Sequence, residues 1–215
     1  MTPSEATEAL QLLVERFRCS YINCEAEKQQ ELVTKIVGDS LYPILLQYPQ
    51  TNFYRVREGD TQKLYDDLHF YSNAKDFSFN PDTSRIGIGR CNHPGVQVLY
   101  CAFEERTAQY EAMSSFRSMG NIEVNIPHIA YIGRWQSTRE LRLVSLIDRQ
   151  EDRDLFVDHY SEWSIYVSEL ITFLRELYVM QATDNPSVYS LTATISEAFL
   201  KRFDGIAFPS SSFLK

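Results

Sequence analysis

Arg90 is the residue whose surroundings most clearly suggest anion binding. It lies in residues 87–95 (GIGRCNHPG), where flexible glycines stand on both sides of a single guanidinium group. In such a loop, backbone N–H groups and the rigid five-donor fork of arginine can converge on a phosphate or pyrophosphate. The motif by itself is more typical of a solvated loop that carries a surface arginine. His93, in the same loop, is expected to be exposed rather than catalytic.

A pair of arginines lies in the segment 52–57 (NFYRVR), whose aromatic and β-branched residues predict a strand. Side chains alternate between the two faces of a strand. Tyr54 and Val56 are therefore expected on one face, with Arg55 and Arg57 on the other. Two neighbouring guanidinium groups on one face would form an edge that attracts anions.

Glu111 and Tyr100 follow in a predicted strand and helix, at residues 95–103 (GVQVLYCAF) and 104–116. A carboxylate that faces a pocket can hold a ribose hydroxyl and stabilise the positive charge that develops when a glycosidic bond breaks. Glu111 is a candidate for this role, although most such helix residues are solvated. Tyr100 either stacks on a base or fills the core.

Ser210 lies at the end of a short predicted strand at residues 206–210 and is either a ligand-positioning hydroxyl or a turn residue. No GxSxG motif is present, and none of the four histidines stands in a recognised relation to the serine, so a serine hydrolase is disfavoured. The sequence also contains no phosphate-binding Walker loop, no GxGxxG fingerprint and no HExxH.

Composition limits the partners. The 215 residues include 21 basic and 29 acidic ones, a net charge of -8, and no basic run exceeds the pair Lys201-Arg202. We therefore expect no nucleic-acid partner, although a few arginines can still bind one small phosphate ligand. The start of the chain lacks a basic signal region and no apolar stretch reaches membrane-spanning length, which predicts a cytoplasmic protein with no membrane partner.

Four cysteines, at positions 19, 24, 91 and 101, form no CxxC pair and no zinc-finger spacing. They are expected to be reduced, packed thiols, and we predict no metal site.

The remaining pattern predicts an α+β fold. Residues 2–48 read as helical, with a capping pattern at Thr2 to Glu5 and a second helical stretch from Glu25 to Gln47. We therefore divide the chain into a helical N-terminal extension, 1–49, and a main domain, 50–215. Beyond the elements named above, the expected segments are a long loop at 76–94, strands at 122–132 and 141–147, an acidic loop or helix start at 148–158, and helices at 161–180 and 186–202.

Four short motifs in this order resemble the RES domain, a family named for its Arg, Glu and Ser. They are FYRV at 53–56, GRCNHPG at 89–95 leading to VLY at 98–100, TAQYE at 107–111 and FDGIAFPS at 203–210. Together they cover about residues 52 to 212. The family usually has GGRWN where this chain has IGRCN at 88–92.

The resemblance implies a fold similar to ADP-ribosyltransferase toxins, with a mixed β core flanked by helices. It also implies an enzyme with no bound cofactor that consumes NAD, cleaving the nicotinamide–ribose bond by phosphorolysis, with phosphate as co-substrate, or by hydrolysis. Many members are toxins held inactive by a helix-turn-helix antitoxin. Residues 1–49 lie outside the resemblance and are interpreted as a regulatory or homodimerising module.

Carried over by motif, Arg55 and Arg90 would bind the pyrophosphate or the attacking phosphate, and Tyr100 would pack on the nicotinamide or ribose. Glu111 would hold ribose hydroxyls and stabilise the oxocarbenium-like transition state, and Ser210 would bond the nicotinamide end. Two alternatives stay open. Residues 109–111 (QYE) resemble the signature of protein mono-ADP-ribosyltransferases, and a catalytically degenerate interaction protein is the other alternative.

Overall fold

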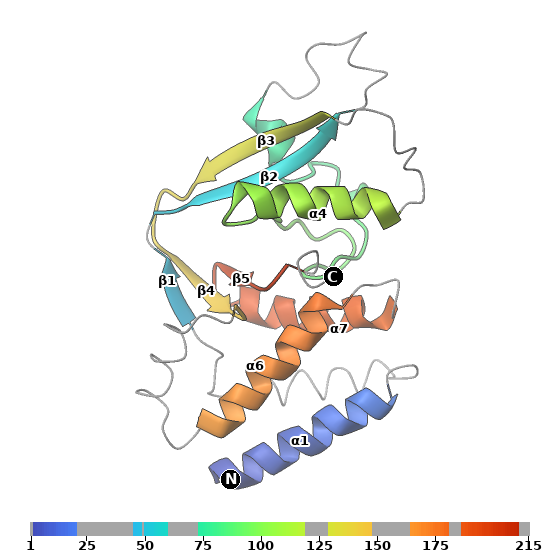
Figure 1. Ribbon diagram of the computed structural model, residues 1–215, viewed down its shortest axis with the longest axis vertical. Coiled ribbons are helices and arrows are strands. Elements are labelled where there is room, and N and C mark those ends of the chain that lie inside the picture. Colours follow the sequence, from blue (N-terminus) through green and yellow to red (C-terminus); the bar gives the residue numbers. More distant parts are fainter. Residues whose placement is uncertain are drawn as a thin grey trace. The chain divides into compact units, whose positions relative to one another are not determined.

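The computed structural model describes residues 2–20, 45–48, 50–59, 73–118, 129–147, 164–180 and 186–210. Within these ranges helices and short strands are mixed, which confirms the α+β class. The elements, drawn in Figure 1, are α1 (Pro3–Ser20), β1 (Leu45–Tyr48), β2 (Asn52–Gly59), the 3₁₀ turns η1 (Ala74–Phe77) and η2 (Thr83–Arg85), α4 (Glu105–Ser118), β3 (Ile129–Gln136), β4 (Leu141–Ser145), α6 (Ser164–Val179), α7 (Pro186–Leu200) and β5 (Gly205–Ala207).

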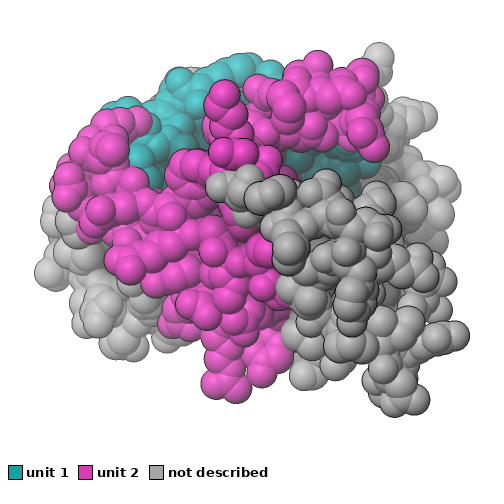
Figure 2. Space-filling view, turned by 90° about the horizontal axis from the view of Figure 1, so that it is seen from above, with its two compact units in different colours: residues 1–48, 87–96, 141–209 teal, residues 49–86, 97–140, 210–215 magenta. Residues whose placement is uncertain are grey.

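The chain forms two compact units, coloured separately in Figure 2. Unit 1 consists of residues 1–48, 87–96 and 141–209, and unit 2 of residues 49–86, 97–140 and 210–215. Each unit is therefore assembled from segments that are far apart in the sequence.

In unit 1, β4 is the central strand of a three-stranded sheet. β1 pairs with it antiparallel, from Leu45 opposite Val144 to Tyr48 opposite Leu141, and β5 pairs with it parallel. The helices α1, α6 and α7 supply most of the core, because the apolar stripe of each helix is buried. The core cluster comprises Leu10, Val14, Val144, Leu146, Leu170, Phe173, Leu174, Leu177, Tyr178, Leu191, Ile195 and Phe199.

Helix α1 begins as the sequence predicts. The Thr2 backbone N–H donates to the Glu5 carboxylate at 2.7 Å, and the Glu5 N–H faces the Thr2 hydroxyl at 3.4 Å. This reciprocal capping box satisfies two of the N–H groups that have no partner inside the helix. Ala6 and Leu10 then bury the face that packs against α6.

In unit 2, β2 and β3 pair antiparallel along their whole length, from Asn52 opposite Gln136 to Gly59 opposite Ile129. On the other side of β2, Tyr54 exchanges two backbone hydrogen bonds with Ala102, at 2.8 and 2.9 Å. Helix α4 packs against β2. This packing places the strand of Arg55 beside the helix of Glu111.

The prediction that the second helix extends to Gln47 is wrong, because residues 45–48 form the strand β1. A short apolar run fits a helix or a strand equally well, and the partner strand β4 decides between them. The strand predicted at 95–103 is also wrong: its one backbone pairing among the described residues is at Ala102, since β2 offers it a partner only at Tyr54.

The strand predicted at 122–132 is shifted, because the ladder with β2 runs from Ile129 to Gln136. The predictions for residues 25–44, 121–128 and 148–158 lie outside the described residues. Strands β2 and β4 and helices α4, α6 and α7 are confirmed. The strand predicted at 206–210 is β5, which ends at Ala207. The resemblance to an ADP-ribosyltransferase arrangement stays a prediction.

None of the helices in the described ranges has both the length and the apolar character needed to cross a membrane.

Candidate functional site

Glu111 and Ser210, which the sequence analysis singled out separately, are in contact within unit 2. The Ser210 hydroxyl donates a hydrogen bond to Oε1 of Glu111 across 99 positions of the chain. Both side chains are half-buried. Hydrogen bonds to an ionised acceptor are stronger than neutral ones. Ser210 therefore holds the carboxylate in one orientation.

Helix α4 presents Glu111 on its protected side. Ala108, one turn before Glu111, is buried, and Thr107 is half-buried. By contrast, Glu105 is exposed and accepts a hydrogen bond from the Gln109 amide at 3.1 Å. The three- and four-residue spacing of a helix thus puts Glu111 on the half-buried side of α4 and leaves Glu105 on the solvent side.

Arg55 and Arg57 extend from the same face of β2, as predicted, and both contact η1. Nη1 of Arg55 donates to the carbonyls of Phe77 at 3.3 Å and Ser78 at 2.7 Å, and Nε of Arg57 donates to the carbonyl of Asp76 at 3.3 Å. The carbonyls at the end of a helical turn lack partners and attract cations. The face expected to be an open anion-attracting edge therefore also holds η1.

The surroundings of Arg55 disfavour the positive charge of its guanidinium group. Its pKa is lowered to about 10, chiefly by burial and then by the positive charge of Arg57. Cys101 has the opposite, smaller effect and raises this pKa. Among the residues that the structure describes, carbonyl acceptors contact Nη1 only. An anion that bonds the remaining nitrogens would offset the cost of burying the charge.

Gly133 of β3 lets η1 approach the sheet. Gly133 lies opposite Arg55 in the strand register, and the buried Phe77 ring packs directly on it. A Cβ at position 133 would stand 2.5 Å from Cδ1 of Phe77. The missing side chain therefore allows the η1 carbonyls to reach Arg55, and a glycine inside a strand is the sequence signal for such a close approach.

Arg90 belongs to unit 1, so it is described apart from the residues above. Its Nη2 donates to the Met180 carbonyl at 3.2 Å and lies 3.4 Å from the Tyr189 hydroxyl. The guanidinium carbon is 5.5 Å from the Tyr189 ring centre and 5.7 Å from that of Phe208. Two aromatic faces and a carbonyl thus fix one side of this arginine.

The N–H group of one Arg90 nitrogen makes no hydrogen bond to the described residues. Nε is buried and has no hydrogen-bond partner among the described residues. A buried donor without a partner costs about 1–3 kcal/mol, and such groups are rare in folded proteins.

Two tight turns build the Arg90 loop. The backbones of Gly89 and Asn92 bond each other, so Arg90 and Cys91 occupy the tip, and the buried Asn92 amide donates to the Gly87 and His93 carbonyls at 2.9 and 3.0 Å. A second turn follows, in which the Val96 N–H donates to the His93 carbonyl. With Pro94 second and Gly95 third at φ 80°, it is a type II turn.

Tyr100, in unit 2, is exposed rather than part of the core, so the core-filling alternative is wrong for this residue. Its stacking on a base or nicotinamide stays a prediction. Cys91 and Cys101 are not joined in a disulfide, and Cys91 packs against the unit 1 core. Within the described ranges, no three His, Cys, Asp or Glu side chains gather in a way that could hold a metal ion.

Sequence reasoning missed three contributors to these sites. It set His93 aside as exposed, whereas the imidazole is half-buried and contacts α7. It did not single out Tyr189, whose only signal is its place one turn into a helix announced by Pro186. It also passed over Phe77, since nothing local to the 76–94 loop indicates that this ring packs on β3.

The comparisons with known proteins agree with the motif order. The family model described as the RES domain matches residues 53–213, well over half of the chain. The protein therefore belongs to the RES-domain family. Searches of curated proteins and of solved structures found no match.

Proposed function

We propose that this protein cleaves the bond between nicotinamide and ribose in NAD. The observation that carries the proposal is the contact between Glu111 and Ser210, because the second and third signature residues of the matched family meet in one half-buried site. Arg55, with its half-buried charge and unused nitrogens, lies on the strand that packs against the helix of Glu111.

In the proposed reaction, the electrons of the C–N bond leave with nicotinamide, which changes from a positively charged to a neutral ring. The ribosyl carbon becomes an oxocarbenium-like centre. The Glu111 carboxylate stabilises this developing charge electrostatically and bonds ribose hydroxyls. Water then attacks and loses a proton to give ADP-ribose, or a phosphate oxygen attacks to give the 1-phosphate.

The arginines are proposed to bind the substrate rather than to react. Arg55 and Arg90 would bond the pyrophosphate or the attacking phosphate, since a planar guanidinium matches phosphate oxygens in pairs. Tyr100 would pack on the nicotinamide or ribose. In this scheme the protein carries no resident cofactor, and NAD is the substrate.

The test is release of nicotinamide from NAD, measured with and without phosphate. Glu111→Gln keeps the shape of the side chain but removes its charge, so we expect release to fall about 100-fold or more. Glu105→Gln, on the exposed side of the same helix, is the matched control and should release nicotinamide as the wild type does. If ample wild-type protein leaves NAD intact, the proposal is wrong.

The same experiment separates the modes of transfer. Dependence on phosphate indicates phosphorolysis, and label from NAD on lysate proteins would indicate protein ADP-ribosylation. The structure offers no added support for protein ADP-ribosylation, because Gln109 and Glu111, two apart on a helix, point in different directions. NAD turnover would also exclude a catalytically degenerate interaction protein.

The family resemblance supports a biological setting for this activity. We propose a cytoplasmic toxin that depletes NAD and is held inactive by a partner protein, an antitoxin or immunity protein. Expression of the wild type alone should halt growth, and Glu111→Gln should not. Equal growth with both proteins, produced at equal levels, would contradict the toxin proposal.

A further inference from the structure

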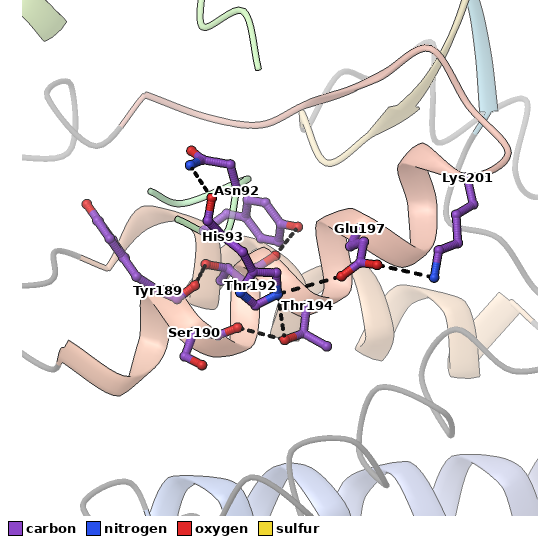
Figure 3. A network of polar contacts seen from close by, with 9 residues as sticks. Asn92, His93, Tyr189, Ser190, Thr192, Thr194, Glu197 and Lys201 are labelled. Carbon is purple, nitrogen blue, oxygen red and sulfur yellow. Dashed lines mark hydrogen bonds and ion pairs between the residues drawn. The ribbon is translucent and has the colours of Figure 1, made fainter. Parts of the chain in front are cut away.

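The loop that carries Arg90 is attached to α7 at a second point, His93. Figure 3 shows the His93 ring lying against α7 between Thr194 and Glu197. Its Nε2 is 3.3 Å from the Thr194 hydroxyl oxygen and 3.7 Å from Oε2 of Glu197. Lys201 approaches the other oxygen of Glu197 at 3.3 Å.

The hydrogen-bond direction follows from the Thr194 hydroxyl. That group has a single proton, which it donates to the Ser190 carbonyl at 2.9 Å. Its oxygen can therefore only accept from His93, so Nε2 of His93 carries a hydrogen. The Glu197 carboxylate favours the same assignment, because it attracts an N–H and repels a lone pair. His93 is thus a donor to α7.

His93 and Arg90 attach the loop to α7 at two separate places along the helix. Arg90 contacts Tyr189 in the first turn of α7, and His93 contacts Thr194 and Glu197 further along. Positions 189 and 197 are about 12 Å apart along a helix. The Asn92 side chain bonds the His93 carbonyl, so the two attachment points are connected through a rigid turn.

We propose that His93 is a positioning residue: its hydrogen bond to Thr194 holds residues 87–96 on α7 and thereby sets the place of the Arg90 guanidinium. The catalytic consequence rests on the proposed function, whereas the docking of the loop does not. His93 does not itself need to touch the substrate.

The docking is tested by hydrogen exchange of residues 87–96 in the full chain. His93→Ala should speed exchange there about tenfold, since it removes one of the contacts that hold the loop on α7. Thr194→Val, which deletes the hydroxyl, should do the same. His93→Gln, whose amide N–H can replace Nε2–H, should restore slow exchange. Lys201→Ala is the control, because Lys201 contacts Glu197 and not His93. Unchanged exchange in His93→Ala overturns the docking.

The positioning role is tested by kinetics of nicotinamide release. His93→Ala should raise KM for NAD about tenfold and leave kcat within about twofold, because Arg90 binds pyrophosphate before and during the reaction. Added to Arg90→Ala, it should have no further effect, since His93 acts through Arg90. Additive losses, or an unchanged KM, overturn the positioning role.

The two experiments separate this inference from the proposed function. A wild-type protein that leaves NAD intact refutes the proposed function and with it the kinetic role of His93. The exchange measurement still decides whether His93 docks the loop.

Discussion

At the scale of residues, the hydrogen bond between Ser210 and Glu111 is open to a direct test. Ser210→Ala removes one hydrogen-bond donor from a half-buried carboxylate, so the carboxylate is held less firmly in its orientation. We expect nicotinamide release to fall about 10-fold or more, in line with the loss of a hydrogen bond to a charged group. Ser210→Thr, which keeps the hydroxyl, should retain more activity. If Ser210→Ala and Ser210→Thr both match the wild type, Ser210 is only a turn residue.

Arg55 leads to a prediction about anions. Folding lowers the pKa of Arg55 to about 10, so the unfolded chain binds more protons between that pH and the ordinary pKa of arginine. Stability from this group therefore rises with pH across that window, and at neutral pH the cost of the buried cation is present in full. A bound anion would offset that cost.

Inorganic pyrophosphate at pH 8 is accordingly expected to raise the melting temperature of the wild type by about 2–5 °C, through preferential binding to the folded state. Arg55→Met should show a much smaller rise, measured by thermal unfolding monitored by fluorescence. Arg134→Met, at an exposed position on β3, is the matched control and should respond as the wild type does. An equal rise in Arg55→Met would contradict a role for Arg55 in anion binding.

At the scale of elements, the contact between η1 and β3 should tolerate no added carbon. Gly133→Ala would push the Phe77 ring and, with it, the carbonyls that Arg55 bonds. We expect the free energy of unfolding to fall by about 1–3 kcal/mol, as in other overpacked sites, together with a weaker response to pyrophosphate.

The control for this change is Gly87→Ala. Nothing lies within 4 Å of a Cβ at position 87 and its φ is not positive, so chemical denaturation should give a free energy of unfolding close to that of the wild type. Equal stability of Gly133→Ala and Gly87→Ala would show that Phe77 can move without cost.

At the scale of the whole molecule, the start of the chain is part of the unit 1 core. Leu10 on α1 is 4% exposed and belongs to the same cluster as α6 and α7, whereas Leu12 on the same helix is 57% exposed. Leu10→Ala should therefore lower the free energy of unfolding by about 2–5 kcal/mol, and Leu12→Ala by less than about 0.5 kcal/mol. Similar effects of both changes in urea denaturation would mean that α1 is a detachable extension.

The elements that could be predicted are those with strong local signals. Helix α7 begins at Pro186, where a proline fits the first helical turn, and the Thr2 to Glu5 pattern marks the start of α1. The two segments that were predicted wrongly, 45–48 and 95–103, lack such signals. Residues 45–48 became a strand because β4 lies beside them, and residues 95–103 form no strand because β2 pairs with them only at Tyr54.

The sequence by itself determined the local geometry of the site: Arg55 and Arg57 on one strand face, Glu111 on a helix, and Arg90 in a glycine-flanked loop. These features follow from side-chain period and backbone sterics, which act over a few residues. Only the tertiary structure decided that Ser210 bonds Glu111, and that His93 bonds Thr194 101 positions away. Such pairs depend on how buried faces pack, and no pattern of neighbouring residues encodes that choice.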